Sequence, residues 1–178
     1  MSAAKNHVLR RLTVSDKGAT AVEFALLMAP LFALILASLQ LAIIFFTGQT
    51  LQTVAIASGR ELMTGTVQKA GDTKAQFKTI VCNNAPSIFQ CGNLMVDVQS
   101  AGAYSSINTS PLTVTYNGAG AVTNTWSYSP GGPGDIVIMR VMYNWPIVGG
   151  PFAVGLANQA NGSHLLVATT VFKNEPYQ

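Results

Sequence analysis

Apolar side chains run from Phe24 to Phe46 without one charged residue, and this stretch dominates the hydropathy of the chain. At about 1.5 Å per residue, a helix over this run extends roughly 34 Å, whereas a bilayer hydrocarbon core is ~30 Å thick. The pattern therefore predicts one membrane-spanning helix. Pro30 lies inside the run and lacks a backbone donor, which predicts a kink at that point.

Beyond Phe46 the apolar positions keep the spacing of one helix face, which predicts that the helix continues to about Met63. Gly59 weakens this helix, and Gly65 is expected to end it. The face consists of Leu51, Val54, Ala55, Ser58 and Leu62. We therefore expect one long helix, half of it in the membrane and half of it packed on a globular head.

A short second helix is expected after Thr73, because Gln76 three residues later completes a capping-box pattern. Phe77, Ile80 and Val81 would form its inward face.

The second half of the chain has the pattern of β-structure, with short segments that alternate or are rich in β-branched residues. The predicted strands are Leu94–Gln99, Leu112–Tyr116, Asp135–Trp145 and His164–Lys173. Helices followed by four short strands predict an α+β fold, in which the long N-terminal helix packs on a small antiparallel sheet of about four strands.

Two features of this half remain open from the pattern alone. Arg140 stands in an otherwise apolar strand and is expected to pair with a carboxylate or to extend its charged end to water. The segment 146–162 is too long for a hairpin turn and would be a packed loop, a membrane-proximal flap or a partner contact. Its apolar residues are Ile147, Val148, Phe152, Val154 and Leu156.

Charge is concentrated before the apolar run. The formal net charge is +3, and residues 1–18 supply all of it with four basic residues and one acid. The positive-inside bias predicts a cytoplasmic N-terminus and places everything after the span outside the cytoplasm. Because the remaining chain is close to neutral, no basic face for nucleic acid is expected. A secretory signal peptide is disfavoured, since its apolar region is usually 7 to 15 residues long.

Cys82 and Cys91 are the two cysteines of the chain, and the predicted topology puts them in an oxidising compartment. A disulfide that closes this small loop is the natural interpretation. Free thiols and a metal pair are the alternatives. The metal pair is disfavoured because His7 and His164 give no ligand set with suitable spacing.

Glu23 is the unusual residue, because a carboxylate at the start of an apolar helix needs a partner or a neutral form. An interfacial Glu near a helix N-terminus is the simpler interpretation. However, the stretch Gly18-Ala19-Thr20-Ala21-Val22-Glu23-Phe24 behind a basic leader resembles the processing site of TadE-like minor pseudopilins of tight-adherence (Flp-type) pilus systems. The closing segment Lys173-Asn174-Glu175-Pro176 is also similar to the ending of such proteins.

This resemblance implies that a prepilin peptidase cuts between Gly18 and Ala19. Glu23, with Phe24 beside it, would then meet the new terminal amine of a neighbouring subunit. The implied partners are other pseudopilins, pilin subunits, the assembly platform and membrane lipids. The implied organisation is a cytoplasmic leader (1–18), a membrane helix (19–46) and a periplasmic domain (47–178) in the bacterial inner membrane, or incorporated into the pilus.

No catalytic constellation is apparent, because Asp72, Asp97 and Asp135 are isolated in sequence and His164 is the lone histidine after the span. We expect no enzyme activity and no cofactor. An uncleaved single-pass anchor that presents a periplasmic binding or scaffold domain is the main alternative, and a hydrolytic envelope enzyme is a weaker one.

Overall fold

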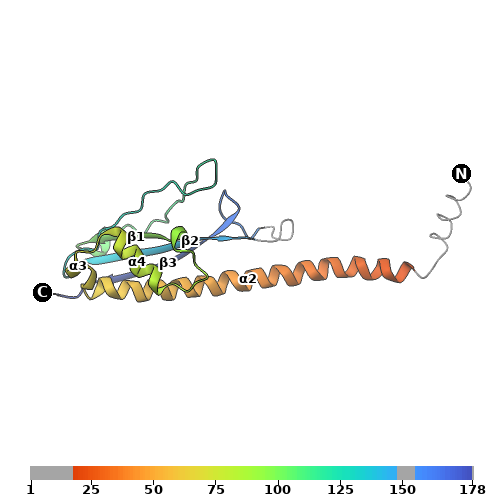
Figure 1. Cartoon of the computed structure of the whole chain (residues 1–178), viewed down its shortest axis with the longest axis horizontal. Coiled ribbons are helices and arrows are strands. Elements are labelled where there is room, and N and C mark those ends of the chain that lie inside the picture. Colours follow the sequence, from red (N-terminus) through yellow and green to blue (C-terminus); the bar gives the residue numbers. More distant parts are fainter. Residues whose placement is uncertain (1–17, 148–154, 178) are drawn as a thin grey trace, which may run out of the picture.

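The computed structural model describes residues 18–147 and 155–177, so the basic leader lies outside the described residues. The elements, drawn in Figure 1, are α2 (Ala19–Met63), α3 (Thr66–Ala70), α4 (Lys74–Asn84), β1 (Met95–Ala101), β2 (Ile136–Pro146) and β3 (Ser163–Lys173). Two 3₁₀ turns, η2 (Cys91–Asn93) and η3 (Tyr104–Ser106), complete the list. The chain therefore consists of one long helix and a small α+β head at its C-terminal half.

The long helix is confirmed, because α2 is a single helix of 45 residues. It stays helical on both sides of Pro30, and the kink expected there stays a prediction. The helix ends at Met63, followed by Gly65 at a φ of 75°, which is a backbone conformation that favours glycine. The sequence signal for the end of the helix was therefore correct.

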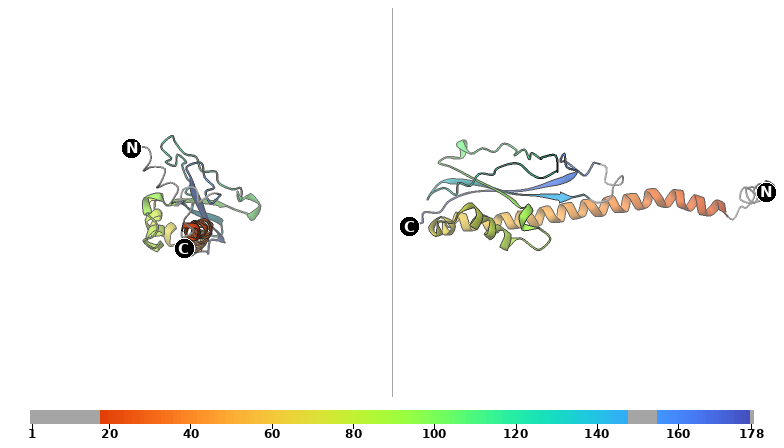
Figure 2. Two further views of the ribbon diagram at one scale, coloured as in Figure 1. Left: turned by 90° about the vertical axis from the view of Figure 1, so that its right-hand side faces the viewer. Right: turned by 45° about the horizontal axis from the view of Figure 1, so that its top comes forward.

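The three strands form one antiparallel sheet in the order β1-β2-β3. In its register Arg140 of β2 lies between Asp97 of β1 and Thr169 of β3. The sheet packs with one face on α2 and α4, while the loops between β1 and β2 cover the other face (Figure 2). The α+β class with a long N-terminal helix is confirmed.

Within residues 18–147 and 155–177 the sheet has three strands rather than about four, because Leu112–Tyr116 does not join it. This segment makes one isolated bridge, between Tyr116 and Val122. The backbone amide of Thr115 donates to the Asn124 side chain at 2.7 Å instead of to a neighbouring strand. The alternating apolar residues Leu112, Val114 and Tyr116 pack on the outer face of the sheet with Met95 and Met142. Alternation here reflects one-sided burial and not strand pairing.

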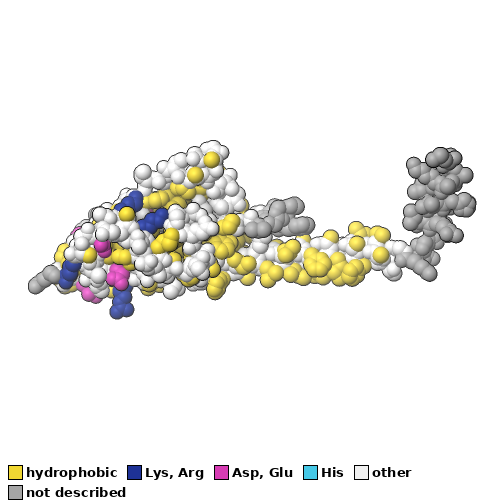
Figure 3. All heavy atoms as spheres, viewed as in Figure 1, with side chains coloured by type: hydrophobic (Ala, Val, Ile, Leu, Met, Phe, Trp, Pro, Cys, Tyr) yellow, Lys and Arg dark blue, Asp and Glu magenta, His cyan; other side chains and the backbone are white. Residues whose placement is uncertain are grey.

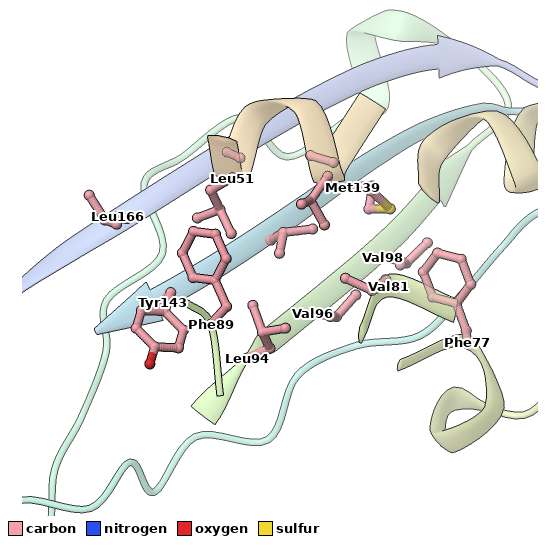
Figure 4. Packing of buried hydrophobic residues seen from close by; sticks show 14 of the residues in the cluster. Leu51, Phe77, Val81, Phe89, Leu94, Val96, Val98, Met139, Tyr143 and Leu166 are labelled. Atoms are coloured by element: carbon pink, nitrogen blue, oxygen red, sulfur yellow. The ribbon is translucent and has the colours of Figure 1, made fainter. Parts of the chain in front are cut away.

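The main core lies between the inner face of the sheet and the two helices (Figure 4). Leu51 of α2, Phe77 of α4 and Met139 of β2 are fully buried in it. The predicted inward face of α4 is confirmed for Phe77 and Val81, which are buried, with Ile80 packed partly buried against the same cluster. The capping box of Thr73 and Gln76 is also present.

Part of the segment 146–162 lies outside the described residues, since residues 148–154 are not described. This includes Val148, Phe152 and Val154 of the apolar set. Ile147 and Leu156, at either side of the gap, pack partly buried against the main core.

Gly59 is a position where α2 approaches the sheet closely. A Cβ at this residue would lie 3.0 Å from Cγ2 of Thr170 and 3.2 Å from Cε1 of Phe172, both on β3. At Gly48, also within α2, the nearest atom to such a Cβ is Cδ2 of Leu166 at 4.0 Å. Gly48 therefore has room for a larger side chain and Gly59 does not, although glycine lowers the helix propensity at both positions.

Substitution at these two glycines is expected to have opposite effects on stability. Gly48→Ala should raise the free energy of unfolding by up to about 1 kcal/mol, through helix propensity. Gly59→Leu should lower it by about 1–3 kcal/mol, because the side chain would overpack the contact with β3. Thermal unfolding of the full chain in detergent micelles measures both. A Gly59→Leu protein that is as stable as the wild type, or more stable, would contradict the close approach at Gly59.

Candidate functional site

The N-terminal half of α2 extends beyond the head and exposes its apolar side chains. Figure 3 shows hydrophobic side chains along this extension, whereas charged side chains gather in the half of the head farther from it. Its most apolar window has a mean hydropathy of 2.3, and the helix is long and apolar enough to cross a membrane. The extension is consistent with single-pass membrane anchoring.

Glu23 lies in the second turn of α2 and is exposed, as is its neighbour Phe24. It is the one charged side chain between Ala19 and Gly59. Among residues 18–147 and 155–177, no cation lies within ion-pair distance of Glu23. A carboxylate on an otherwise apolar membrane helix is costly when unpaired, so this side chain requires a partner from another chain, from the solvent or from the terminal region.

Gly18 stands directly before the first residue of α2. Its φ of −92° is ordinary, and no side chain caps the helix at this point. A Cβ at Gly18 would have no atom within 4 Å, so a larger side chain here would meet no other part of the described residues. Ala19 and Glu23 lie one helical turn apart on one face, which places their Cβ atoms about 5–6 Å from each other.

The comparison with protein families is informative for this helix. Residues 18–60 match the model of the TadE-like protein family. The resemblance inferred from the motif at Gly18 is thereby confirmed over these residues. No curated protein and no solved structure matches the chain significantly.

The TadE-like match begins at Gly18 and includes Ala19, Glu23 and Phe24, so it contains every residue of the predicted processing and assembly motif. It ends at Arg60, close to the end of α2, and does not reach the sheet. The match associates the chain with a tight-adherence pilus system and with partners from that system in general terms. The head, by contrast, is described by its structure alone.

The disulfide between Cys82 and Cys91 is present, with the two Cα atoms 5.5 Å apart. It joins the last turns of α4 to the turn η2 ahead of β1. The bond lies in the head, well outside the TadE-like match, and therefore acts on the fold of the head. Within residues 18–147 and 155–177, no three His, Cys, Asp or Glu side chains lie together as a metal site would require.

The closing segment, which resembles the ending of TadE-like proteins, holds the end of the head together. Asn174 is buried, and its Nδ2 donates to the carbonyl oxygens of Pro130 at 2.9 Å and Gly132 at 3.1 Å. The backbone amide of Glu175 donates to the carbonyl of Met63 at 2.8 Å. This segment therefore ties the end of β3 to the end of α2 and to the loop before β2. The motif was visible in the sequence, but its structural role was not.

Arg140 pairs with a carboxylate, as one of the two expectations had it. Its Nη1 lies 3.5 Å from Oδ2 of Asp97, and both side chains are almost fully buried. Nη2 of Arg140 donates to the carbonyl of Asn108 at 2.5 Å and to that of Ser110 at 3.3 Å. The backbone amide of Ser127 donates to Oδ1 of Asp97 at 2.8 Å. The pair thus fastens two loops to the outer face of the sheet.

Tyr128 carries the largest shift in acidity among the described residues of the head. Burial raises the pKa of its hydroxyl to about 12, and the nearby Asp72 charge acts in the same direction. The hydroxyl donates to the Asp72 carbonyl at 3.0 Å, and the ring packs on Phe77. Since the folded-state pKa is above the unfolded value of about 10, this residue stabilises the fold fully only below about pH 10.

Stability is therefore expected to fall as pH rises from about 10 to about 12, where the unfolded chain has lost the Tyr128 proton and the folded chain retains it. Chemical unfolding of the wild-type chain and of Tyr128→Phe across this range measures the difference. The variant should have a flatter profile, because phenylalanine has no proton to lose. Parallel profiles for the two proteins would contradict this assignment.

Proposed function

We propose that the chain is a minor pseudopilin that primes or supports assembly of a Flp-type pilus after cleavage between Gly18 and Ala19. The observation that carries the proposal is Glu23, the one charged side chain between Ala19 and Gly59 of α2, five residues after Gly18 and inside the TadE-like match. Prepilin peptidase, other pseudopilins, pilin subunits and the inner-membrane platform are the proposed partners.

Cleavage would give Ala19 a free amine at the end of an apolar helix. In a setting of few waters, an amine and a carboxylate 4 Å apart attract by about 4 kcal/mol at an effective dielectric constant of 20. Part of that attraction offsets the desolvation of both groups. The Glu23 carboxylate of one subunit would therefore fix the axial position of a neighbour's helix by accepting from its amine.

The head would then lie in the periplasm, on the side opposite the basic leader. The positive-inside bias supports this orientation. The disulfide between Cys82 and Cys91 also supports it, because such bonds persist in the oxidising periplasm. The apolar part of α2 would hold the subunit in the membrane until assembly.

Gly18→Val tests the cut site. Valine adds a branched side chain where the peptidase must hold the backbone closely, so we expect the full-length precursor to accumulate. Gly92→Val is the matched control, because a Cβ at Gly92 also has no atom within 4 Å but lies in the head. Product of mature size from Gly18→Val, seen on immunoblots of membranes, would exclude this cut site.

An uncleaved anchor with a binding head is the second candidate, and one feature of the head favours it. A groove of about 470 Å³ lies on the outer face of the sheet, between residues 109–112 and strand β3. Val167 and Val171 of β3 line it and are about half exposed. A leader retained in cells that contain the peptidase would favour this candidate over the pseudopilin.

A further inference from the structure

The end of the head nearest the N-terminal extension of α2 forms an apolar crevice. The crevice has a volume of about 170 Å³ and is lined almost entirely by apolar surface. Its lining residues come from one turn of α2, from the end of β2 and from the residue that follows β2, and are Gln40, Ile43, Ile44, Trp145, Pro146 and Ile147. Apolar cavities of about 150 Å³ stay dry and accept small apolar ligands, so this space suits several methylene groups.

The crevice lies at the depth where the membrane-spanning run ends. If the hydrocarbon core begins at Phe24, a helix needs about 20 residues to cross it and leaves it near Ile43. If the core begins instead at Ala19, the helix leaves it near Leu39. Both limits bring the Gln40–Ile44 turn to the outer boundary of the bilayer. Trp145 and Ile147 lie beside that turn and therefore share its depth.

The surface around the crevice continues the apolar surface of the membrane helix. Ile43 is 47% exposed, Phe45 65% and Phe46 67%, although all three stand within the length of α2 that reaches the head. No charged side chain occurs in α2 between Phe24 and Gly59, and none occurs between Val141 and Phe172. The charged groups visible in Figure 3 lie in the half of the head away from this end. Exposure of such an apolar surface to water is unfavourable, whereas contact with lipid acyl chains removes it from water.

We propose that this end of the head lies in the membrane interface, and that the crevice takes part of the acyl chain of a membrane lipid. Trp145 would anchor the head at headgroup level, as tryptophan does at membrane boundaries. The acyl chain would contact Ile43, Ile44 and Ile147. The head then has a fixed height above the bilayer instead of turning freely on α2. This proposal rests on insertion of α2 and is independent of cleavage at Gly18 and of pilus assembly.

Depth-dependent quenching of tryptophan tests the proposal, because the chain has two tryptophans in different places. Trp126→Phe leaves Trp145 at the crevice, and Trp145→Phe leaves Trp126 in the loop over the outer face of the sheet. Each full-length protein is reconstituted in phosphatidylcholine vesicles whose acyl chains carry bromine in their upper half. Lipid bromine should quench Trp145 at least about threefold more strongly than Trp126, because only an interfacial side chain meets the acyl chains.

Equal quenching of the two tryptophans would overturn the interfacial position. Ile147→Glu then tests the crevice itself, since a carboxylate there repels an acyl chain; its fold is checked by the retained unfolding transition. Quenching of Trp145 should fall to less than about half in this variant and stay above that of Trp126, because the side chain remains at the interface without an acyl chain beside it. Unchanged quenching in a folded Ile147→Glu protein would overturn the acyl-chain site. Neither experiment contains a peptidase or other pilus proteins. A negative result would therefore overturn the lipid-binding proposal without deciding whether the chain is cleaved or takes part in pilus assembly.

Discussion

Glu23→Gln is expected to lower the number of surface pili at least about tenfold, while the protein still inserts in the membrane in normal amount. The amide keeps the size of the carboxylate but carries no charge to attract the amine of a neighbouring Ala19. A tenfold loss needs only about 1.4 kcal/mol, which is well below the attraction of about 4 kcal/mol estimated for the pair. Sheared filaments and immunoblots of washed membranes measure the two quantities.

Glu61→Gln is the matched control for this substitution, because it makes the same chemical change on the same helix. Glu61 lies in the part of α2 that packs with the head and is half-buried. It is also one residue beyond the end of the TadE-like match. Piliation should be normal in this control. If Glu23→Gln cells carried normal numbers of pili, the carboxylate would have no part in assembly.

Asp97→Ala is expected to lower the free energy of unfolding of the head by about 3–5 kcal/mol, because it leaves the Arg140 guanidinium buried without its counter-charge. The two side chains are 3% and 5% exposed, so water compensates little. The backbone amide of Ser127 would also lose its acceptor. Thermal unfolding of the full chain in detergent, followed by tryptophan fluorescence, measures the loss.

The double variant Asp97→Leu with Arg140→Met provides the control for this pair. It removes both charges and fills similar volume with apolar groups, an exchange that is often neutral or stabilising for buried ion pairs. The double variant should therefore be more stable than Asp97→Ala. A cost below about 0.5 kcal/mol for Asp97→Ala, typical of surface positions, would contradict the burial and pairing of these residues.

The sequence predicted well where one physical signal acts over consecutive residues. The length of α2, its end before Gly65 and the cap at Thr73 all follow from local hydropathy, backbone preference and short-range hydrogen bonding. The family resemblance likewise rests on a continuous motif around Gly18 and Glu23. These features can be predicted without knowing which other segments pack against them.

The features that the sequence did not reveal depend on contacts between distant segments. Asp97 is isolated in sequence, and only the register of β1 and β2 brings its partner Arg140 beside it. Leu112–Tyr116 has the alternation of a strand, yet its apolar side packs on the sheet while its backbone bonds locally. The role of Asn174 depends on its contact with the loop at Pro130, 44 residues earlier in the chain. Alternation and composition indicate which side chains are buried, but they do not indicate which distant segment those side chains contact.

The N-terminus of the protein purified from membranes tests the central claim most directly. N-terminal sequencing and intact mass are compared for cells with and without the cognate prepilin peptidase. The account predicts a chain that begins at Ala19 when the peptidase is present and a chain that keeps its leader when it is absent. A leader retained in both samples would contradict the pseudopilin assignment and leave a signal anchor with a periplasmic head.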